Sequence, residues 1–409
     1  MAIKRFWVIA YRDLVRNKRR TLLTLLAVAL GMMVLIMMSG LLAGIIAGGL
    51  RDNIRLNTGH LQLRDDTYEI EKLSLLSRDL LQDSDILVSQ AEALSEVQSA
   101  APVLWSSGVL STVRESTGLQ VTGIDPNDDF HAPVREGIVD GDYLTADGRG
   151  QVLIGKRLAD DMDITVGQRV SLTMGGADGQ VNEDIFTVAG LFNTGILNYD
   201  QNTVIMPLAQ AQAFSNSGSR TSSIIVMLND REDTAKVAAA LQAPGISVLT
   251  WEDLNALLLT LMEQAGGFYY ILYIIVILVV AVLIANTLLM SVFERTRELG
   301  ILASLGMKGR QIMLMVLFEA IILALLGVAA GLVLGAGLIA YLARVGIEFS
   351  ADAMGAIEGM ALGSKMYPAF APADALVLSL LMFFIVSLVS IYPAWYAARI
   401  EPVKALHAL

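Results

Sequence analysis

The chain has 409 residues, of which 55% are hydrophobic and 17% charged, and its formal net charge at pH 7 is −11. Soluble proteins average about 25% charged residues, and the apolar excess is gathered into four long runs, which excludes both a purely soluble enzyme and a purely membrane-buried bundle. The absence of cysteine excludes disulfide bonds, thiol catalysis and cysteine zinc sites. The three histidines, His60, His131 and His407, are far apart in sequence, and we expect no metal site.

The four apolar runs span residues 21–49, 264–293, 311–343 and 375–398. About 20 apolar residues suffice to cross a bilayer, so each run predicts a transmembrane helix. The first run is too long for a signal-peptide core and is followed by no A-x-A-like cleavage site, so we expect it to be retained.

Basic residues predict the orientation of these spans. They crowd residues 1–20 and recur in the connection 294–310 and the tail 399–409. The positive-inside rule therefore places both termini and residues 294–310 in the cytoplasm, and the domain 50–263 and the loop 344–374 outside.

The domain at 50–263 is strongly acidic. It holds 14 Lys/Arg against 31 Asp/Glu, a net charge of −17, while the rest of the chain sums to +6. This asymmetry argues against nucleic-acid binding. Together with the lack of cysteine, it is compatible with a bacterial inner membrane protein whose large domain is periplasmic or extracellular.

Strand and helix signals alternate along this outside domain. "HLQLRD" and "SSIIVMLND" predict strands near its two ends, whereas "DSDILVSQAEALSEVQ" and "DTAKVAAALQAPG" have helical periodicity. Gly, Asn and Asp punctuate a strand-rich region between them. We therefore expect an α+β domain in which residues 52–105 and 221–262 form an α/β subdomain and residues 106–220 a β-rich insert.

Two segments of this domain suggest ligand sites but are better explained as turns. Asp125, Asp128 and Asp129 lack the Gly and the distant Glu of an EF-hand loop, and Pro126 favours a turn. "GGADGQ" at 175–180 is interpreted as a hairpin turn rather than a phosphate loop. No G-x-x-x-x-G-K-[ST] motif and no Ser/His/Asp set occurs in the printed sequence, so we predict no catalytic residue, and energy must come from another polypeptide.

The spans carry three unusual features. Glycines recur every four residues and predict close helix packing, either within one copy or between two copies; they are Gly40, Gly44 and Gly48 in the first span and Gly327, Gly331 and Gly335 in the third. Four methionines, Met32, Met33, Met37 and Met38, could contact a greasy substrate, lipid or other helices. Glu319 interrupts the third span, and we favour a structural ion pair with a basic residue over proton coupling.

Two cytoplasmic stretches are amphipathic. "FWVIAYRDLVRNKRR" within 1–20 predicts a basic interfacial helix. "ERTRELGILASLGMKGRQI", residues 294–312, predicts a short helix that either docks in the groove of a cytoplasmic partner or lies flat on lipid.

The second of these stretches resembles the cytoplasmic loop of FtsX-like permeases of ABC transporters. "LFEAIILALLGVAAGLVLG" (317–335) and "YPAWYAARIEPVKAL" (392–406) resemble the third span and the usual ending of the same family. With the basic start, the four spans and the large first loop, the resemblance covers the whole chain, and it is greatest to the MacB-type and lipoprotein-releasing (LolC/LolE-like) permeases.

The resemblance implies a permease dimer, with an identical or paralogous second permease, and two copies of a separate ATPase that binds ATP and Mg. This chain itself would bind no cofactor and would not be an enzyme. Its connection 294–310 would hold the coupling helix of a mechanotransmission device. The residues implied to contact the ATPase are Arg297, Glu298, Leu299, Gly300, Ile301, Leu302, Leu305 and Gly306.

Three outputs remain open at this point. The first is extraction of a lipoprotein or another hydrophobic substrate from the outer leaflet of the inner membrane, with delivery to a periplasmic acceptor. Candidate lining residues are Met33, Met37, Ile45, Phe268 and Tyr269. The others are drug or peptide efflux and FtsX-like activation of an extracytoplasmic partner.

Overall fold

The computed structural model describes residues 16, 18–68, 75–76, 79–146, 148–348 and 365–399. The chain divides into a helical unit (Met1–Ile46, Leu261–Ile347 and Tyr367–Leu409) and an outer unit (Ala47–Thr260 and Glu348–Met366). Most of the predicted basic helix 1–20, of the loop 344–374 and of the tail 399–409 lies outside the described residues.

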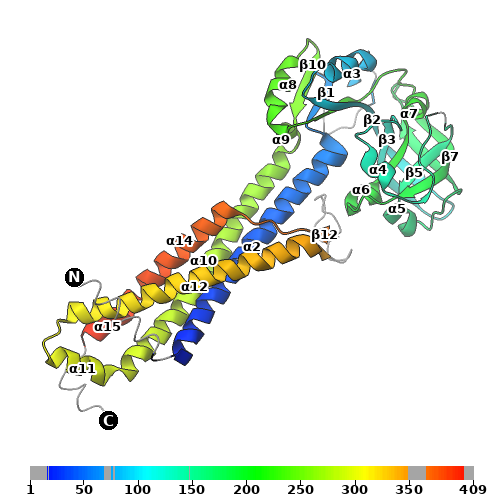
Figure 1. Ribbon diagram of the computed structural model, residues 1–409. Coiled ribbons are helices and arrows are strands. Elements are labelled where there is room, and N and C mark those ends of the chain that lie inside the picture. Colours follow the sequence, from blue (N-terminus) through cyan, green and yellow to red (C-terminus); the bar gives the residue numbers. More distant parts are fainter. Residues whose placement is uncertain are drawn as a thin grey trace. The chain divides into compact units, whose positions relative to one another are not determined.

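Among the described residues, the helical unit contains four helices that are long and apolar enough to cross a membrane. They are α2 (Lys18–Asn53), α10 (Ala256–Glu294), α12 (Gly309–Val345) and α14 (Pro372–Val389), the last continuing after Ser390 as α15 (Ile391–Ala398). The short helix α11 (Thr296–Ser304) joins α10 to α12 (Figure 1). Charged residues delimit the predicted spans, but helices can carry charges beyond the bilayer, and α10 begins well before residue 264.

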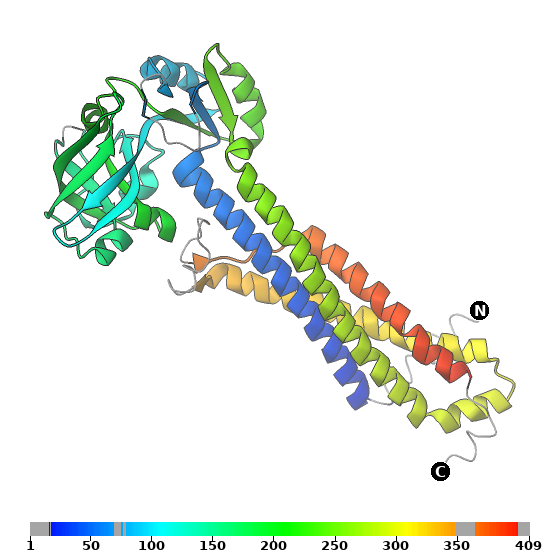
Figure 2. The ribbon, with the colours of Figure 1, turned by 180° about the vertical axis from the view of Figure 1, so that it is seen from behind.

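Glycines bring α12 close to α2 within one chain. A Cβ on Gly331 would lie 2.5 Å from the carbonyl oxygen of Ala29, and one on Gly327 would lie 2.5 Å from Cβ of Val28. Such positions accept only glycine, because any side chain would force the helices apart. Figure 2 shows α2, α10, α12 and α14 from behind.

The other glycines of the two four-residue repeats divide into two groups. Gly335 faces Ile36, Gly40 faces Ile339, and Gly44 approaches the carbonyl oxygen of Tyr367, which would lie 2.5 Å from a Cβ added there, all within one chain. A Cβ added at Gly48 would have nothing within 4 Å among the described residues. Packing within one copy therefore accounts for these glycines except Gly48.

The outer unit is built on one sheet of ten strands. The strands are β1 (Leu61–Asp65), β2 (Val97–Ser111), β3 (Ser116–Ile124), β4 (Ile138–Gly141), β5 (Gln151–Gly155), β6 (Arg169–Gly175), β7 (Val181–Phe192), β8 (Thr203–Pro207), β9 (Ser223–Leu228) and β10 (Ile246–Thr250). Six of these strands close a small barrel, because their pairings return to the starting strand. The pairings are β2–β3, β3–β8, β8–β5, β5–β7, β7–β6 and β6–β2. Strands β10, β1 and β9 extend the sheet from β2.

Short helices cover this sheet. They are α3 (Ser84–Glu92), α4 (Ala132–Glu136), α5 (Lys156–Asp161), α6 (Leu197–Asn202), α7 (Leu208–Phe214) and α8 (Thr234–Ala240), with the 3-10 turn η3 at Arg231–Asp233. A two-stranded ribbon, β11 (Ile347–Glu348) with β12 (Lys365–Met366), lies apart from the ten strands in sequence.

Strand β2 belongs to both parts of the outer unit. Its residues 97–103 pair with β9, whereas residues 103–111 pair with β3, and 108–111 also pair with β6. The division expected between residues 105 and 106 thus falls inside β2, just after its pairing changes. Each part has its own core, one around Leu63 and Val226 and one around Leu172 and Val188.

Both segments interpreted as turns are turns. In "GGADGQ" the Gly176 N–H donates to the carbonyl of Gln180, Gly179 has φ +79°, and the flanking strands β6 and β7 pair. The carboxylates of Asp125 and Asp128 accept N–H groups two residues ahead of each. Within the described part of the chain, no group of three or more His, Cys, Asp or Glu could hold a metal.

We predict that Gly331→Ala destabilises the protein by about 1–3 kcal/mol, because the added methyl group overlaps the backbone of α2. Gly337→Ala is the matched control: it lies on the same helix, with nothing within 4 Å of its Cβ among the described residues. Thermal unfolding in detergent should show a lower Tm for the first variant alone. Equal Tm values would contradict the close contact.

Candidate functional site

Helix α11 is amphipathic. Leu299 is 2% exposed and Gly300 is also buried, whereas Ile301 and Leu305 are 43% and 79% exposed. The helix ends in a Schellman turn: Gly306 has φ +96°, and the N–H of Met307 donates to the carbonyl of Leu302 at 3.1 Å. Its outer face therefore presents isolated aliphatic side chains, which suit a groove in a partner.

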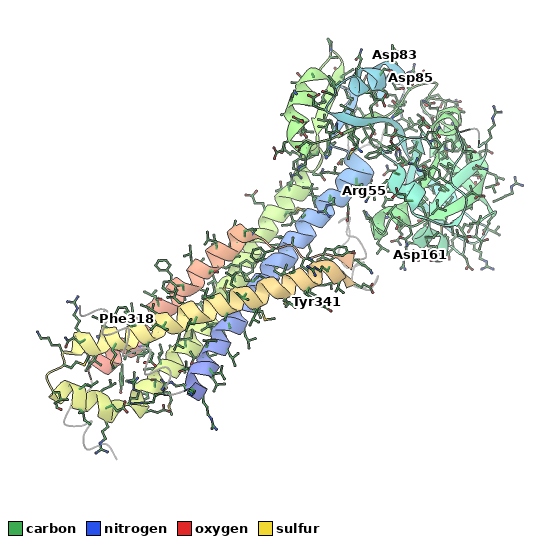
Figure 3. All side chains as sticks on the ribbon, in the orientation of Figure 1. Arg55, Asp83, Asp85, Asp161, Phe318 and Tyr341 are labelled. Carbon is green, nitrogen blue, oxygen red and sulfur yellow. The ribbon has the colours of Figure 1, made fainter. Side chains whose placement is uncertain are left out.

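The inner face of α11 is fixed to three other helices. Leu299 packs in a cluster with Val292 of α10, Ile312 and Met315 of α12, and Ala394 of α15. Figure 3 labels Phe318 on α12 near this end of the bundle and Tyr341 near the other end. Because the other buried side chains of this cluster come from α10, α12 and α15, the inner face of α11 is packed against all three helices.

A chain of alternating charges, here called the charge ladder, joins α10, α11 and α12 to the start of α2. Its members are Arg16, Glu298, Arg295, Glu319, Arg20 and Glu294. The guanidinium of Arg16 donates to both carboxylate oxygens of Glu298, at 2.5 and 2.7 Å. Arg295 donates to Glu298 at 3.2 Å and to Glu319 at 3.4 Å. Arg20 donates to Glu319 at 3.1 Å and to Glu294 at 3.4 Å.

Glu319 is the most enclosed member of the ladder. Its side chain is only 4% exposed, and the side chains of its two flanking arginines, Arg20 and Arg295, are 18% and 10% exposed. A buried carboxylate costs free energy unless it is paired. The structure thus places a cation on each side of Glu319, one from α2 and one from the junction between α10 and α11.

Glu298 links the ladder to α11. Burial raises the pKa of its carboxyl, but the hydrogen bonds from Arg16 and Arg295 and their charges outweigh burial, so the pKa of Glu298 lies below its ordinary value. The carboxylate is therefore ionised at neutral pH, and it holds α11 to the start of α2.

At their other ends, α2 and α10 lead into neighbouring strands of the outer unit. Helix α2 continues through the π-helix η1 (Ile54–Thr58) into β1, and β10 leads through α9 (Trp251–Leu254) into α10. β1 and β10 pair antiparallel, with Leu61 opposite Thr250. The Asn53 amide donates to Asn255 at 2.5 Å, and the Trp251 N–H donates to the carbonyl of His60. The junctions of the two helices with the sheet are therefore joined by hydrogen bonds.

The residues predicted to contact an ATPase fall into three groups. The first group is exposed or half-buried: it consists of the exposed residues Arg297, Ile301, Leu305 and Gly306 and the half-buried Leu302. Leu299 and Gly300 are buried against the bundle, and Glu298 is engaged by arginines. Leu299 and Gly300 are buried because one face of a short helix must bury its apolar residues to hold the helix in place, and contact of these residues with an ATPase stays a prediction.

The predicted substrate-lining residues lie on two helices. Met33, Met37 and Ile45 are half-buried on α2. On α10, Phe268 is 61% exposed, and Tyr269 packs against the core of the bundle. Their role toward a substrate stays a prediction.

Sequence reasoning missed most of the charge ladder. It singled out Glu319 and Glu298 but not Arg16, Arg20, Arg295 or Glu294 as their partners. A signal was present, because arginines and glutamates border the spans where these begin and end. The pairing itself joins residues hundreds of positions apart, such as Arg16 and Glu298, and no local pattern specifies it.

Comparison with known proteins agrees with this architecture. Residues 21–243 match the MacB-like periplasmic core domain, and residues 270–402 match the FtsX-like permease C-terminal domain. The lipoprotein-releasing system transmembrane protein LolC of Xylella fastidiosa is 23% identical over 334 residues, which cover 76% of this chain and 78% of that protein.

One further relative and one solved structure match shorter regions of the chain. The macrolide export ATP-binding/permease protein MacB of Syntrophobacter fumaroxidans is 32% identical over 126 residues, 30% of this chain but 15% of that protein. The periplasmic region of MacB from Actinobacillus actinomycetemcomitans has a solved structure with 16% identity and a TM-score of 0.35, covering 51% of this chain and 97% of that one.

The two matched domains together account for most of the chain, in the order that the structure shows. The described part of the chain holds four candidate membrane helices, and the large domain of periplasmic type lies between the first and the second. The chain belongs to the MacB-type, FtsX-like permeases of ABC transporters.

Proposed function

We propose that this chain is the permease subunit of an ABC transporter that works by mechanotransmission and is driven by a separate ATPase chain. In this proposal, closure of two ATPase copies moves α11, and the motion reaches the outer unit through the helices. A second permease, identical or paralogous, completes the complex. Both termini and α11 lie in the cytoplasm, as the basic residues near them indicate.

The observation that carries this proposal is the charge ladder. It ties α11 to α2, α10 and α12 by ion pairs and hydrogen bonds of 2.5 to 3.4 Å. A push on the exposed Ile301 and Leu305 would thus be transmitted to three spanning helices at once, rather than being absorbed by a loose loop.

The continuity of the helices supports transmission to the outer unit. Helix α2 runs unbroken from Lys18 to Asn53 and α10 from Ala256 to Glu294. An α-helix is stiff along its axis, because each turn is hydrogen-bonded to the next. Both helices lead into the paired strands β1 and β10, so a displacement at the α11 end would be passed to the sheet.

For the substrate, we propose a lipoprotein or another hydrophobic molecule in the outer leaflet of the inner membrane. The similarity to LolC extends over 76% of this chain. The half-buried Met33 and Met37 on α2 offer flexible, polarizable side chains that adapt to acyl chains. A periplasmic acceptor would then receive the released molecule.

Docking of the ATPase can be tested by native mass spectrometry of the full-length complex purified in mild detergent. We predict that the wild-type complex contains two ATPase copies and that Ile301→Asp/Leu305→Asp loses them, because charge replaces the exposed apolar contacts. Val139→Asp, an exposed substitution in the outer unit, should retain them. ATPase retention by the double variant would refute the docking surface.

We predict that Glu319→Gln lowers the free energy of unfolding by about 3 kcal/mol, because Arg20 and Arg295 then lose their shared buried counter-ion. Glu294→Gln is the control: Glu294 is 51% exposed, and its loss should cost at most about 1 kcal/mol. Tm values in detergent measure both. Equal shifts would mean that Glu319 is not the centre of the ladder.

For the substrate route, we predict that Met37→Asp/Ile45→Asp abolishes transport and leaves ATPase assembly intact, because a charged face repels acyl chains. Release of a triacylated lipoprotein from proteoliposomes is the readout, with Val345→Asp, an exposed change on α12, as the control. Unchanged release of the lipoprotein by this variant would mean that α2 does not line the substrate route. ATPase stimulation by a protein partner alone, with no transported molecule, would instead favour a regulator.

A further inference from the structure

A cavity of about 730 Å³ lies between the start of α2 and the last turns of α10. Lys18 and Arg19 line it from α2, and Asn286, Thr287 and Met290 line it from α10, together with three members of the charge ladder. It therefore combines surface cations with residues of a membrane-spanning segment.

The residues that the structure describes do not balance the charge of this cavity. The charge ladder is neutral by itself, since three arginines pair with three glutamates. Lys18 and Arg19 are exposed, and neither has an ion-pair partner among the residues that the structure describes. Within the described part of the chain, two positive charges thus remain available to an anion.

The α10 wall of the cavity contains a polar group that needs a partner. The hydroxyl of Thr287 donates to the carbonyl of Leu283. The amide of Asn286 is exposed and makes no hydrogen bond within the described part of the chain, although it stands between the exposed apolar residues Leu283 and Met290. An unpaired amide at membrane depth is costly, so a polar ligand group there is favourable.

We infer that this cavity binds an anionic phospholipid of the leaflet at the α11 end of the bundle. Lys18 and Arg19 hold the phosphate, and Asn286 hydrogen-bonds a glycerol or ester oxygen below it. The acyl chains lie along the exposed aliphatic face of α10, where Val279, Val282 and Leu283 are 65%, 58% and 48% exposed. Basic pockets between membrane helices are suited to such headgroups.

Two other occupants fit less well. A second copy of the chain that covered this cavity in a two-fold contact would bring both copies of Lys18 and Arg19 into one interface, where like charges repel unless acidic residues separate them. Free inorganic phosphate shares the anionic chemistry, but it would leave Asn286 and the exposed aliphatic side chains of α10 without a partner.

Native mass spectrometry of the full-length protein, titrated with phosphatidylglycerol or phosphatidylcholine, tests the inference. The wild type should retain phosphatidylglycerol in preference to phosphatidylcholine. Lys18→Gln/Arg19→Gln should weaken phosphatidylglycerol binding about tenfold or more, at about 1 kcal/mol for each cation. Lys308→Gln/Arg310→Gln is the matched control, since it removes the same charge at the same end of the bundle from outside the cavity.

The variant Asn286→Leu distinguishes a bound phospholipid from a bound soluble anion. It should weaken phosphatidylglycerol binding although it leaves every charge in place, and millimolar inorganic phosphate should not displace the lipid. Equal retention of both lipids by the wild type, equal losses in the two charge variants, or displacement by phosphate would overturn the inference. So would a lipid-free wild-type dimer that Asn286→Leu dissociates, since a second copy would then cover the groove.

Discussion

The buried carboxylate of Glu319 constrains how the helices pack at the end of the bundle that carries α11. A charged group enclosed among apolar helices is stable only where cations reach it, and here they come from two other helices, as Arg20 and Arg295. Helices α2, α10 and α12 must therefore meet at a fixed depth and rotation. α11, held through Glu298, takes its position from the same pairing. Packing of apolar side chains alone tolerates sliding, whereas paired charges specify register.

Close backbone contacts reinforce this register along the bundle. Gly327 and Gly331 allow α12 to approach α2 near Val28 and Ala29, only two turns from Arg20. In lipid, helix association depends on such close packing, since apolar surface gains little by leaving one apolar solvent for another. Charge pairing and glycine packing thus act on the same pair of helices, and α2 and α12 can be regarded as one rigid element.

Much of this organisation could be predicted from the sequence. The runs of apolar residues located the spans, and "GGADGQ" specified its hairpin locally, because glycine permits the backbone angle needed at Gly179. The closed barrel could not be predicted, because it depends on β6 returning to β2 across about sixty residues. The partners of Glu319 were equally out of reach: Arg20 and Arg295 become its neighbours only once the helices are assembled. Burial of Leu299 and Gly300 depends on α12 and α15 in the same way.

The pairing of β1 with β10 has a mechanical consequence. The residue pair Leu61 and Thr250 lies next to both helix junctions. The two helices therefore attach at the same end of the β1–β10 strand pair. Pulling the two junctions apart, across the strands, would break the hydrogen bonds between β1 and β10 one residue pair at a time. Moving them together along the strand axis would instead load the bonds between β1 and β9 in shear, all at once. The pairings of β1 therefore resist displacement of the two junctions along the strand axis far better than separation of the junctions.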